Sequence, residues 1–390
     1  MKIVFYTHPN FLNHQSMPRF ASMLINGMKE RGHEVISWSP QAFFFKEKLP
    51  ASIKKWLSYI DQYVIFPLVV KKRLKACSPE TLFVFTDQAL GPWIPQIIQR
   101  PHAIHCHDFL ALRSALDEIP ENRTQWTGRV YQKFIQKGFS KGKNFISVSH
   151  KTKDDLHRLI IGKKPEMSEV VYNGLNQKFV VIPSITARRQ VTVFSGINVD
   201  DGFVLHVGGN LWYKNRAGVI QIYNAWRKNS TLKIPLLMVG EIPDNGLMEV
   251  YKKSDFSEDI YFLSKITDDQ VRILYSAASV LLFPSIAEGF GWPIAEAMAS
   301  GCPVITTNEA PMTEVAGNAA YLIRKRNNSA EDANWPEECA AVLDTLLSLS
   351  DEKRTALIES GLVNIQRFAT DKTLDSIEAI YKKILAQNSI

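Results

Sequence analysis

Hydrophobic and polar residues alternate along the chain in two distinct patterns. Short runs rich in β-branched and aromatic residues are typical of buried strands, and the stretches between them repeat apolar residues at helical spacing. The run Lys2–Thr7 is followed by apolar residues at positions 20, 21, 24, 25 and 28 and then by the run Glu34–Trp38. This β-α-β opening and its repetition predict an α/β protein with parallel sheets.

The remaining strand candidates form two series. The first occupies residues 81–85, 103–105, 145–149 and 169–172, and the second occupies residues 203–207, 235–239, 260–263, 280–283 and 303–306. Between them, residues 183–201 are polar and show no period, so we place the interdomain linker there. We expect an N-terminal domain of residues 1–185, a C-terminal domain of residues 186–365, and a helix of residues 366–390 that packs across to the N-terminal domain.

The length of 390 residues suits two domains of ordinary size. Each series of strands predicts a Rossmann-like, doubly wound sheet, in which ligands bind at the carboxyl ends of the strands. Two such domains that face one another would bind their ligands in the cleft between them. We therefore expect the functional site in an interdomain cleft.

Composition narrows the class of protein. Hydrophobic residues make up 45% and charged residues 22% of the chain, so we expect it to fold throughout. The net charge of +7 favours anionic partners such as a nucleotide, a phospholipid surface or RNA. The chain shows no leader pattern at its start, no apolar run near the roughly 20 residues that span a bilayer, and four widely separated cysteines. These features predict a cytoplasmic protein.

The segment Pro284–Val304 carries the strongest chemical signal. A buried strand ends at Phe283, a glycine-containing loop follows, and Pro293 stands where the first residue of a helix is expected. Gly289 and Gly291 let a ligand approach the backbone, and the N–H groups and dipole of the new helix attract an anion. We infer a phosphate site at this loop.

Two carboxylates flank this phosphate site. Glu288 lies in the loop and Glu296 lies about one turn into the helix, so both can bind hydroxyl groups on either side of a diphosphate. Taken alone, the motif Glu-Gly-Phe-Gly is equally consistent with a strand, a loop and a helix that carry ordinary surface carboxylates. The full string of 21 residues favours the ligand site.

The string EGFGWPIAE followed by AMASGCPV resembles the E-x7-E signature of the family 4 retaining glycosyltransferases, which have the GT-B fold. The resemblance extends to residues 171–176, 206–215, 268–279 and 314–317 and covers most of residues 100–320. It implies transfer of a sugar from a nucleoside-diphosphate sugar to a glycan or lipid-linked glycan acceptor, in the synthesis of a bacterial surface polysaccharide or glycoconjugate. It implies no nucleic acid partner.

The resemblance also implies roles for the residues of the signature. Glu288 and the backbone of Gly289, Phe290 and Gly291 would hold the hydroxyl groups of the transferred sugar. Glu296 would hold the hydroxyl groups of the ribose.

Further roles follow for two loops before the signature. The segment that contains Lys265 and Ile266 would face the base, largely through its backbone. Lys214, with Gly208 and Gly209 of the phosphate-binding loop, would hold the diphosphate. A lysine and a helix N-terminus stabilise the negative charge of a departing nucleoside diphosphate, so we expect no metal and no other cofactor to be required.

The phosphate-binding loop departs from the family in one respect. Many relatives have an arginine two or three residues after the strand, where this chain has Gly208-Gly209-Asn210. Arg216 is a candidate substitute, although an arginine beside Asn215 is more typical of a solvated helix residue. Lys214 therefore carries more of the prediction.

Residues of the first domain are candidates for the acceptor side. His107, in the motif His105-Cys106-His107-Asp108, follows a strand and resembles the histidine at the catalytic cleft of the family. A structural histidine and, with less support, a metal ligand are the alternatives. Asn13, His14 and Ser16 follow the first strand and are candidates to bind the acceptor, although Ser16 also suits a helix cap.

Residues 43–77 interleave aromatic and aliphatic residues with lysines. A basic amphipathic surface of this kind can lie on anionic lipid, which predicts peripheral contact with the inner face of the cytoplasmic membrane. Solvated lysines around helices that pack on the core are an equally good explanation.

Other classes of protein fit the sequence less well. A nucleotide-dependent oxidoreductase expects G-x-G-x-x-G directly after a strand, but the Gly-Phe-Gly of the signature is followed by Ile294 where the third glycine should be. A nucleotide-sugar epimerase or an inverting transferase on the same scaffold, and a non-catalytic sugar-binding subunit, are further alternatives. The two glutamates of the signature, together with Lys214 and His107, favour the retaining transferase.

Overall fold

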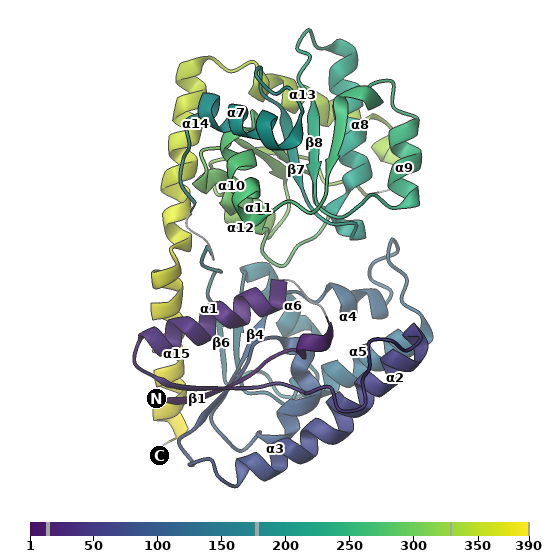
Figure 1. Cartoon of the computed structure of the whole chain (residues 1–390). Coiled ribbons are helices and arrows are strands. Elements are labelled where there is room, and N and C mark those ends of the chain that lie inside the picture. The colour runs from purple at the N-terminus through teal and green to yellow at the C-terminus, as the bar shows by residue number, and fades with distance from the viewer. Residues whose placement is uncertain (13–15, 176–178, 328–329, 389–390) are drawn as a thin grey trace. The chain divides into compact units, whose positions relative to one another are not determined.

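A computed structural model describes residues 1–12, 16–175, 179–327 and 330–388 of the chain (Figure 1). It divides into two compact units. The first unit comprises Met1–Asn176 and Thr370–Ile390, and the second comprises Gln177–Ala369. Each unit is built on its own parallel sheet, so the predicted α/β class with two Rossmann-like sheets is confirmed.

The first unit contains a six-stranded parallel sheet in the order β2-β1-β3-β4-β5-β6. Every strand predicted for this part of the chain is present. The strands are β1 (Lys2–Tyr6), β2 (Glu34–Trp38), β3 (Leu82–Phe85), β4 (His102–Cys106), β5 (Asn144–Ser147) and β6 (Met167–Val170).

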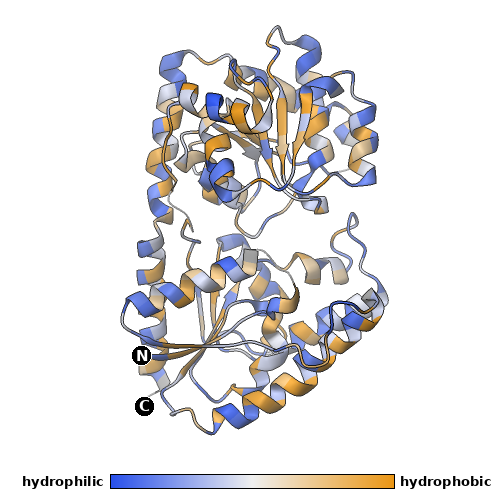
Figure 2. Ribbon diagram, in the orientation of Figure 1, coloured by the Kyte–Doolittle hydropathy of each residue, from blue (hydrophilic) through white to orange (hydrophobic). Residues whose placement is uncertain are grey.

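Successive residues of these strands pack on opposite faces of the sheet, because side chains alternate along a strand. Val4 and Phe83 belong to a core with Trp93 on one face. Their neighbours in sequence, such as Ile3, pack on the other face with Leu374. Since both faces are covered, the strands are hydrophobic at almost every position, as Figure 2 shows for both sheets.

Helices and short helical turns connect the strands of the first unit. One nearly continuous helical segment, residues 51–74, consists of two α-helices with a π-helical turn between them. The elements are η1 (Asn10–Leu12), α1 (Ser16–Glu30), α2 (Ala51–Ile60), η2 (Asp61–Ile65), α3 (Phe66–Leu74), η3 (Gln88–Gln96), α4 (Leu110–Ala115), α5 (Trp126–Phe139), α6 (His150–Leu159) and the C-terminal α15 (Thr370–Asn388).

The second unit contains a six-stranded parallel sheet in the order β12-β11-β10-β7-β8-β9. Its strands are β7 (Val204–Val207), β8 (Leu236–Val239), β9 (Ile260–Leu263), β10 (Val280–Phe283), β11 (Val304–Thr307) and β12 (Tyr321–Ile323). The edge strand β12 was not predicted, because a run of three residues is too short to show a period.

The helical elements of the second unit surround this sheet (Figure 1). They are α7 (Ser184–Ser195), η4 (Trp212–Lys214), α8 (Arg216–Asn229), α9 (Asn245–Lys252), η5 (Ser257–Asp259), α10 (Asp268–Ala277), α11 (Trp292–Ala299), α12 (Met312–Ala316), η6 (Ala330–Asn334), α13 (Trp335–Leu347), α14 (Asp351–Asn364) and η7 (Ile365–Phe368).

The prediction that residues 183–201 form a linker is wrong, because α7 occupies most of this range. The helix buries only Ala187 and Val191, too few residues to produce a visible helical period. Arg188 fixes it to the second unit by donating a hydrogen bond from Nε to the carbonyl oxygen of Ala277 (3.2 Å). A glycine in the left-handed region, Gly196 (φ 72°), ends the helix.

The units divide near residues 176 and 369 rather than after the expected residues 185 and 365. Residues 179–185 pack on the second unit, where the carbonyl oxygen of Val180 accepts a hydrogen bond from Ser276 Oγ (3.4 Å). Phe368 also belongs there, with its ring 5.4 Å from that of Phe290.

The C-terminal helix α15 belongs to the first unit. Its apolar residues Leu374, Ile377 and Tyr381 are buried in the core beside α1 and β1. The hydroxyl of Tyr381 lies 2.7 Å from Nε2 of His105, which ties the helix to β4. Within the described residues, no helix is both long enough and apolar enough to span a membrane.

Candidate active site

The loop 284–291 joins β10 to α11 at the carboxyl edge of the second sheet. Gly291 has a φ of 101°, which side-chain-bearing residues rarely adopt, and this turn directs the chain into the helix. The helix begins at Trp292, so Pro293 is its second residue rather than its first as predicted. Its first N–H groups therefore lie at the edge of the sheet where ligands of doubly wound folds bind.

Glu288 and Lys214 form an ion pair beside this loop. Lys214 Nζ lies 2.7 Å from Glu288 Oε1, and the two side chains are only 16% and 9% exposed. Ser285 Oγ donates a second hydrogen bond to the same carboxylate oxygen (2.6 Å). The sequence had placed these two residues on different parts of a ligand, and the structure brings them into direct contact.

Aromatic rings and backbone contacts hold the Lys214 ammonium in place. Nζ lies 5.3 Å from the ring centre of Tyr213 and 5.2 Å from that of Phe283. The carbonyl oxygen of Tyr213 accepts a hydrogen bond from the N–H of Ile286 (2.7 Å), and Ser285 Oγ, whose single proton goes to Glu288, lies 2.8 Å from this carbonyl oxygen. These contacts join the loop after β7 to the loop after β10, so they hold the loop of Lys214 next to the loop of Glu288.

Glu296 lies on α11 and is held by a tyrosine. The hydroxyl of Tyr275, on the neighbouring α10, donates a hydrogen bond to Glu296 Oε2 (2.9 Å). Burial, together with the Glu296 charge, raises the pKa of Tyr275 well above its usual value, so the phenol stays protonated and remains a donor. Sequence analysis missed Tyr275, although it lies within residues 268–279, which resemble the family.

The phosphate-binding loop is packed closely against the loop after β8. A β-carbon at Gly240 would collide with the carbonyl oxygen of Gly208, so glycine is required there. The N–H of Asn210 donates to Glu241 Oε2 (2.9 Å), and the Glu241 carboxylate lies against Gly209. Neither contact was predicted.

Arg216, the first residue of α8, is buried rather than solvated, with an exposed fraction of 5%. Its Nη1 donates to Asn210 Oδ1 and to the carbonyl oxygen of Glu241 (3.0 Å). Its guanidinium lies 5.7 Å from the ring centre of Phe262, and burial lowers its pKa. Among the described residues, Nε and Nη2 have no hydrogen-bond partner. The alternative that Arg216 is a solvated helix residue is therefore wrong.

Lys265 and Ile266 follow β9, and Lys265 is exposed with a φ of 60°. Because β10, β7, β8 and β9 are neighbours in this order, the residues that follow them form a row along one edge of the sheet. Glu288, Lys214, Glu241 and Lys265 occur in that row.

In the first unit, His107 follows β4 and is almost fully buried. Its Nε2 lies 2.9 Å from the carbonyl oxygen of Thr86, which only an N–H can bond, so Nε2 carries the proton. The backbone N–H of His107 donates to Gln88 Oε1 (2.9 Å), and its backbone carbonyl oxygen accepts from Thr152 Oγ1 (3.0 Å). Burial lowers the pKa of His107, so the imidazole is neutral near pH 7.

Asp87 is a second polar residue at this edge of the sheet, and sequence analysis missed it. It follows β3 just as His107 follows β4, so the same strand-end rule applies to it. His8 Nε2 lies 2.8 Å from Asp87 Oδ2. Burial alone would raise the pKa of Asp87, but the hydrogen bond and the charge of His8, together with a hydrogen bond from the backbone N–H of Ala89 (2.8 Å), lower it, so the carboxyl is ionised.

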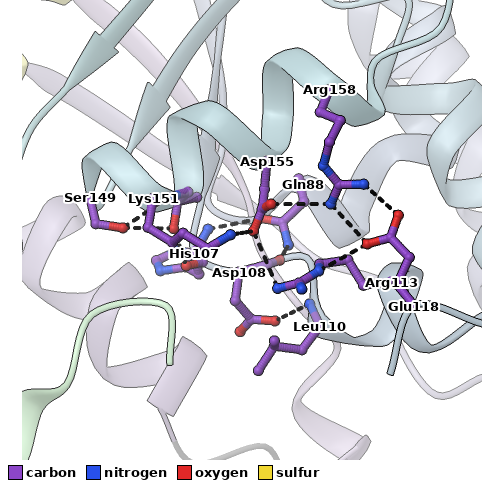
Figure 3. A network of polar contacts seen from close by, with 11 residues as sticks. Gln88, His107, Asp108, Leu110, Arg113, Glu118, Ser149, Lys151, Asp155 and Arg158 are labelled. Atoms are coloured by element: carbon purple, nitrogen blue, oxygen red, sulfur yellow. Dashed lines mark hydrogen bonds and ion pairs between the residues drawn. The ribbon is translucent and has the colours of Figure 1, made fainter. Parts of the chain in front are cut away.

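A cavity of about 220 Å³ lies over these residues and includes Asp87, Gln88, His107 and Asp108 in its lining. Figure 3 shows the polar contacts behind it, where helix α6 carries Asp155. Asp155 binds Lys151 (2.6 Å) and Arg158 (3.2 Å) of the same helix. Asp155 also pairs with Arg113 of α4 (3.7 Å), and Arg113 and Arg158 both pair with Glu118, so the network joins α6 to α4.

The expected acceptor residues are described only in part. Asn13 and His14 lie outside the described residues, and Ser16 is the first residue of α1.

Two family profiles match consecutive parts of the chain. The profile for glycosyltransferase family 4 matches residues 17–179, and the profile for glycosyl transferases group 1 matches residues 188–362. Among curated proteins, the O-antigen chain mannosyltransferase B of Escherichia coli is 28% identical over 184 residues, which are 46% of each chain. The O-antigen chain mannosyltransferase RfbU of Salmonella typhimurium is 26% identical over 209 residues, 53% of each chain. The matches span about half the length of these relatives.

Solved structures match over nearly the whole chain. The sucrose-phosphate synthase of Thermosynechococcus elongatus has a TM-score of 0.73 at 16% identity, covering 99% of this chain and 100% of that one. Anabaena HepE, in complex with UDP and glucose, has a TM-score of 0.69 at 17% identity, covering 98% and 99%. WaaG, a glycosyltransferase involved in lipopolysaccharide biosynthesis, has a TM-score of 0.66 at 16% identity, covering 96% and 99%. The matching structures and the family profiles agree. The chain belongs to the family 4, group 1 glycosyltransferases and has their GT-B fold.

Proposed function

We propose that this protein is a retaining glycosyltransferase that transfers a sugar from a nucleoside-diphosphate sugar to a hydroxyl group of a glycan or lipid-linked glycan. The product would belong to a bacterial surface polysaccharide, because two relatives are mannosyltransferases of O-antigen chains. The ion pair between Lys214 and Glu288 beside the start of α11 is the observation that carries this proposal.

A nucleoside diphosphate suits the row of strand-end residues in the second unit. The Lys214 ammonium and the N–H groups at the start of α11 would bind its phosphates, while Glu288 would accept hydrogen bonds from sugar hydroxyls. Glu296, held by Tyr275, would accept them from the ribose. In this arrangement the positive groups lie where negative charge develops as the diphosphate leaves. No metal is needed for this step.

The reaction would break the bond from the anomeric carbon to the diphosphate oxygen and form a bond from that carbon to the acceptor oxygen. The proton of the acceptor hydroxyl would pass to the departing diphosphate on the same face of the sugar, which gives retention. In the first unit, His107 would contribute an unprotonated Nδ1 as a hydrogen-bond acceptor, because its proton is on Nε2.

Mannose is the sugar that we expect, because three of the curated relatives are named as mannosyltransferases, among them one from Mycolicibacterium hassiacum. The base is tested by thermal shift with UDP-, GDP-, ADP- and dTDP-sugars, since a ligand of the native state raises the unfolding temperature. Retention is tested by the anomeric configuration of the product in NMR. A product of inverted configuration, or no stabilisation by any nucleotide sugar, would contradict the proposal.

A further inference from the structure

The helical segment α2-η2-α3 of the first unit carries a stripe of exposed apolar side chains, and part of its buried side is polar, although Phe66 and Val70 are buried there too. Large apolar side chains lie on its outside, where Trp56 is 65% exposed and Leu68 is 62% exposed. The same stripe contains Ile53, Ile60 and Val64. Its inner side buries the polar residues Ser58, Asp61 and Gln62.

Hydrogen bonds hold the polar residues of the segment on its buried side. The Asp61 carboxylate accepts from the N–H groups of Phe43, Phe44 and Phe45 at 2.9–3.1 Å. Gln62 Nε2 donates to Ser58, and the carbonyl oxygen of Gln62 accepts from Trp93 Nε1 (2.9 Å). Rotating the segment to bury its apolar stripe would break these bonds and leave the N–H groups of residues 43–45 and Trp93 Nε1 without their acceptors. The apolar stripe is therefore held outward.

The π-helical turn η2 keeps the stripe straight. In an α-helix, residues four apart drift by about 40° around the axis at each step, because there are 3.6 residues per turn. The stripe advances by four residues from Trp56 to Ile60, Val64 and Leu68. The wider turn at residues 61–65 counteracts the drift, so all four side chains stay on one side.

Helix α5 adds a second apolar stripe next to the first. Trp126, Val130 and Phe134 are spaced four apart and are 75%, 50% and 45% exposed. Aromatic contacts join the two helical segments. The rings of Tyr59 and Tyr131 stack with their centres 5.4 Å apart. The ring of Tyr63 lies 5.5 Å from that of Phe134. We call the two stripes together the apolar face.

The charge around the apolar face is predominantly positive. Residues 43–77 contain eight lysine and arginine residues but only two acidic residues, Glu47 and the buried Asp61. Helix α5 contains Arg129, Lys133 and Lys137 and no acidic residue. Phe134 and Lys137 also line an apolar cavity of about 410 Å³, so the face and the cavity share these two residues.

We propose that the apolar face binds the surface of a membrane that contains anionic phospholipid. The aromatic and aliphatic side chains would insert among the acyl chains, and the lysines around them would bind lipid phosphates. A second copy of the chain fits less well, because two faces of the same positive charge would repel each other. This proposal does not depend on sugar transfer.

Vesicle sedimentation tests it, with phosphatidylcholine vesicles and with vesicles that also contain phosphatidylglycerol. The wild-type chain should sediment with the anionic vesicles at low salt and be released by high salt. Trp56→Glu and Leu68→Glu should abolish binding. Val363→Glu, at a 73% exposed valine of the second unit, is the matched control and should bind as the wild type does.

The lysines have a matched control of their own. Lys71→Gln with Lys72→Gln should lower the partition coefficient about fivefold for each lysine removed. Lys252→Gln with Lys253→Gln, at an exposed lysine pair of the second unit, should leave it unchanged. All substituted positions are exposed, so equal melting temperatures should show that each variant folds.

The results separate the possible partners. Absence of sedimentation with both kinds of vesicle, or binding that survives Trp56→Glu and Leu68→Glu, overturns the proposal. If the chain is instead a dimer by light scattering and Leu68→Glu converts it to a monomer without any vesicle binding, the face is an interface between copies and the lipid proposal is wrong.

Discussion

Tyr275 and Glu296 are joined by a 2.9 Å hydrogen bond between two neighbouring helices of the second unit. The donor is a fully buried phenol, and the acceptor is a carboxylate one turn into the helix that follows the glycine loop. The bond fixes the rotamer of Glu296. The position of this carboxylate is thus set by a residue that no ligand needs to contact.

Replacing Tyr275 with phenylalanine keeps the ring and removes this bond. We expect the free energy of unfolding to fall by about 1.5–3 kcal/mol, as for a hydrogen bond to a charged group. The Kd for a nucleoside diphosphate should rise about tenfold, equivalent to about 1.4 kcal/mol, because Glu296 is no longer positioned. Calorimetry measures the Kd, and a Kd equal to that of the wild type would contradict this role.

Lys214 and Glu288 should act as a coupled pair. Lys214→Ala and Glu288→Gln should each lower turnover at least tenfold, and the double variant should lose less than the product of the two single losses, because the residues are in contact. Lys214→Arg keeps the charge and should recover part of the activity. Near-normal turnover in either single variant would defeat the assignment.

Melting temperatures provide the control for these two variants. Lys214→Ala leaves the Glu288 carboxylate with its Ser285 hydrogen bond, so the chain should remain folded. Loss of activity with an unchanged melting temperature shows a functional role, whereas unfolding would leave Glu288→Gln, which keeps the shape of the side chain, as the deciding variant.

Arg216 should strengthen diphosphate binding. We expect Arg216→Met to weaken binding of a nucleoside diphosphate about tenfold and to leave binding of the corresponding nucleoside unchanged, because its buried positive charge lies behind the phosphate-binding loop and acts on the charged phosphates but not on the uncharged nucleoside. Arg216→Lys keeps the positive charge but lacks the planar set of donors. Its affinity for a nucleoside diphosphate should therefore lie between those of the wild type and Arg216→Met. Equal losses for nucleoside and nucleoside diphosphate would show that Arg216 acts only by supporting its loop.

Two buried histidines should make the chain sensitive to acid. Burial lowers the pKa of His105 and that of His206 to about 3, from 6.5. At a pH between 3 and 6.5, each histidine is protonated in the unfolded chain but not in the folded chain. The free energy of unfolding therefore has its full value above about pH 6.5 and falls as the pH decreases. Each histidine contributes about 1.4 kcal/mol per pH unit in this window.

Urea unfolding at pH 7.5 and pH 5 measures this effect. His105→Gln removes the contribution in the first unit, and His206→Gln removes it in the second. Each variant should lose less stability on acidification than the wild type. A variant with the same loss of stability as the wild type would show that its histidine is not kept neutral in the folded state.

The sequence alone determined the parts of this protein that depend on neighbours along the chain. The strands of both sheets were predicted, apart from β12, because most are short, nearly continuous runs of apolar residues; β6 (Met167–Val170) is half polar and overlaps the predicted run only at residues 169 and 170. The glycine loop before α11 was predicted because Gly291 and Pro293 specify a turn and a helix start within a few residues. The family resemblance, and with it the residues around the donor, came from the same local strings.

The tertiary structure decided the contacts between residues far apart in sequence. β10 lies beside β7, although β8 and β9 come between them in the chain, and this strand order is what brings Glu288 to Lys214. Burial of Arg216 and the outward apolar stripe of residues 51–74 likewise depend on which side of a helix packs on the sheet. The spacing of residues predicts an amphipathic helix, but it does not determine which of its sides is bound by the rest of the protein.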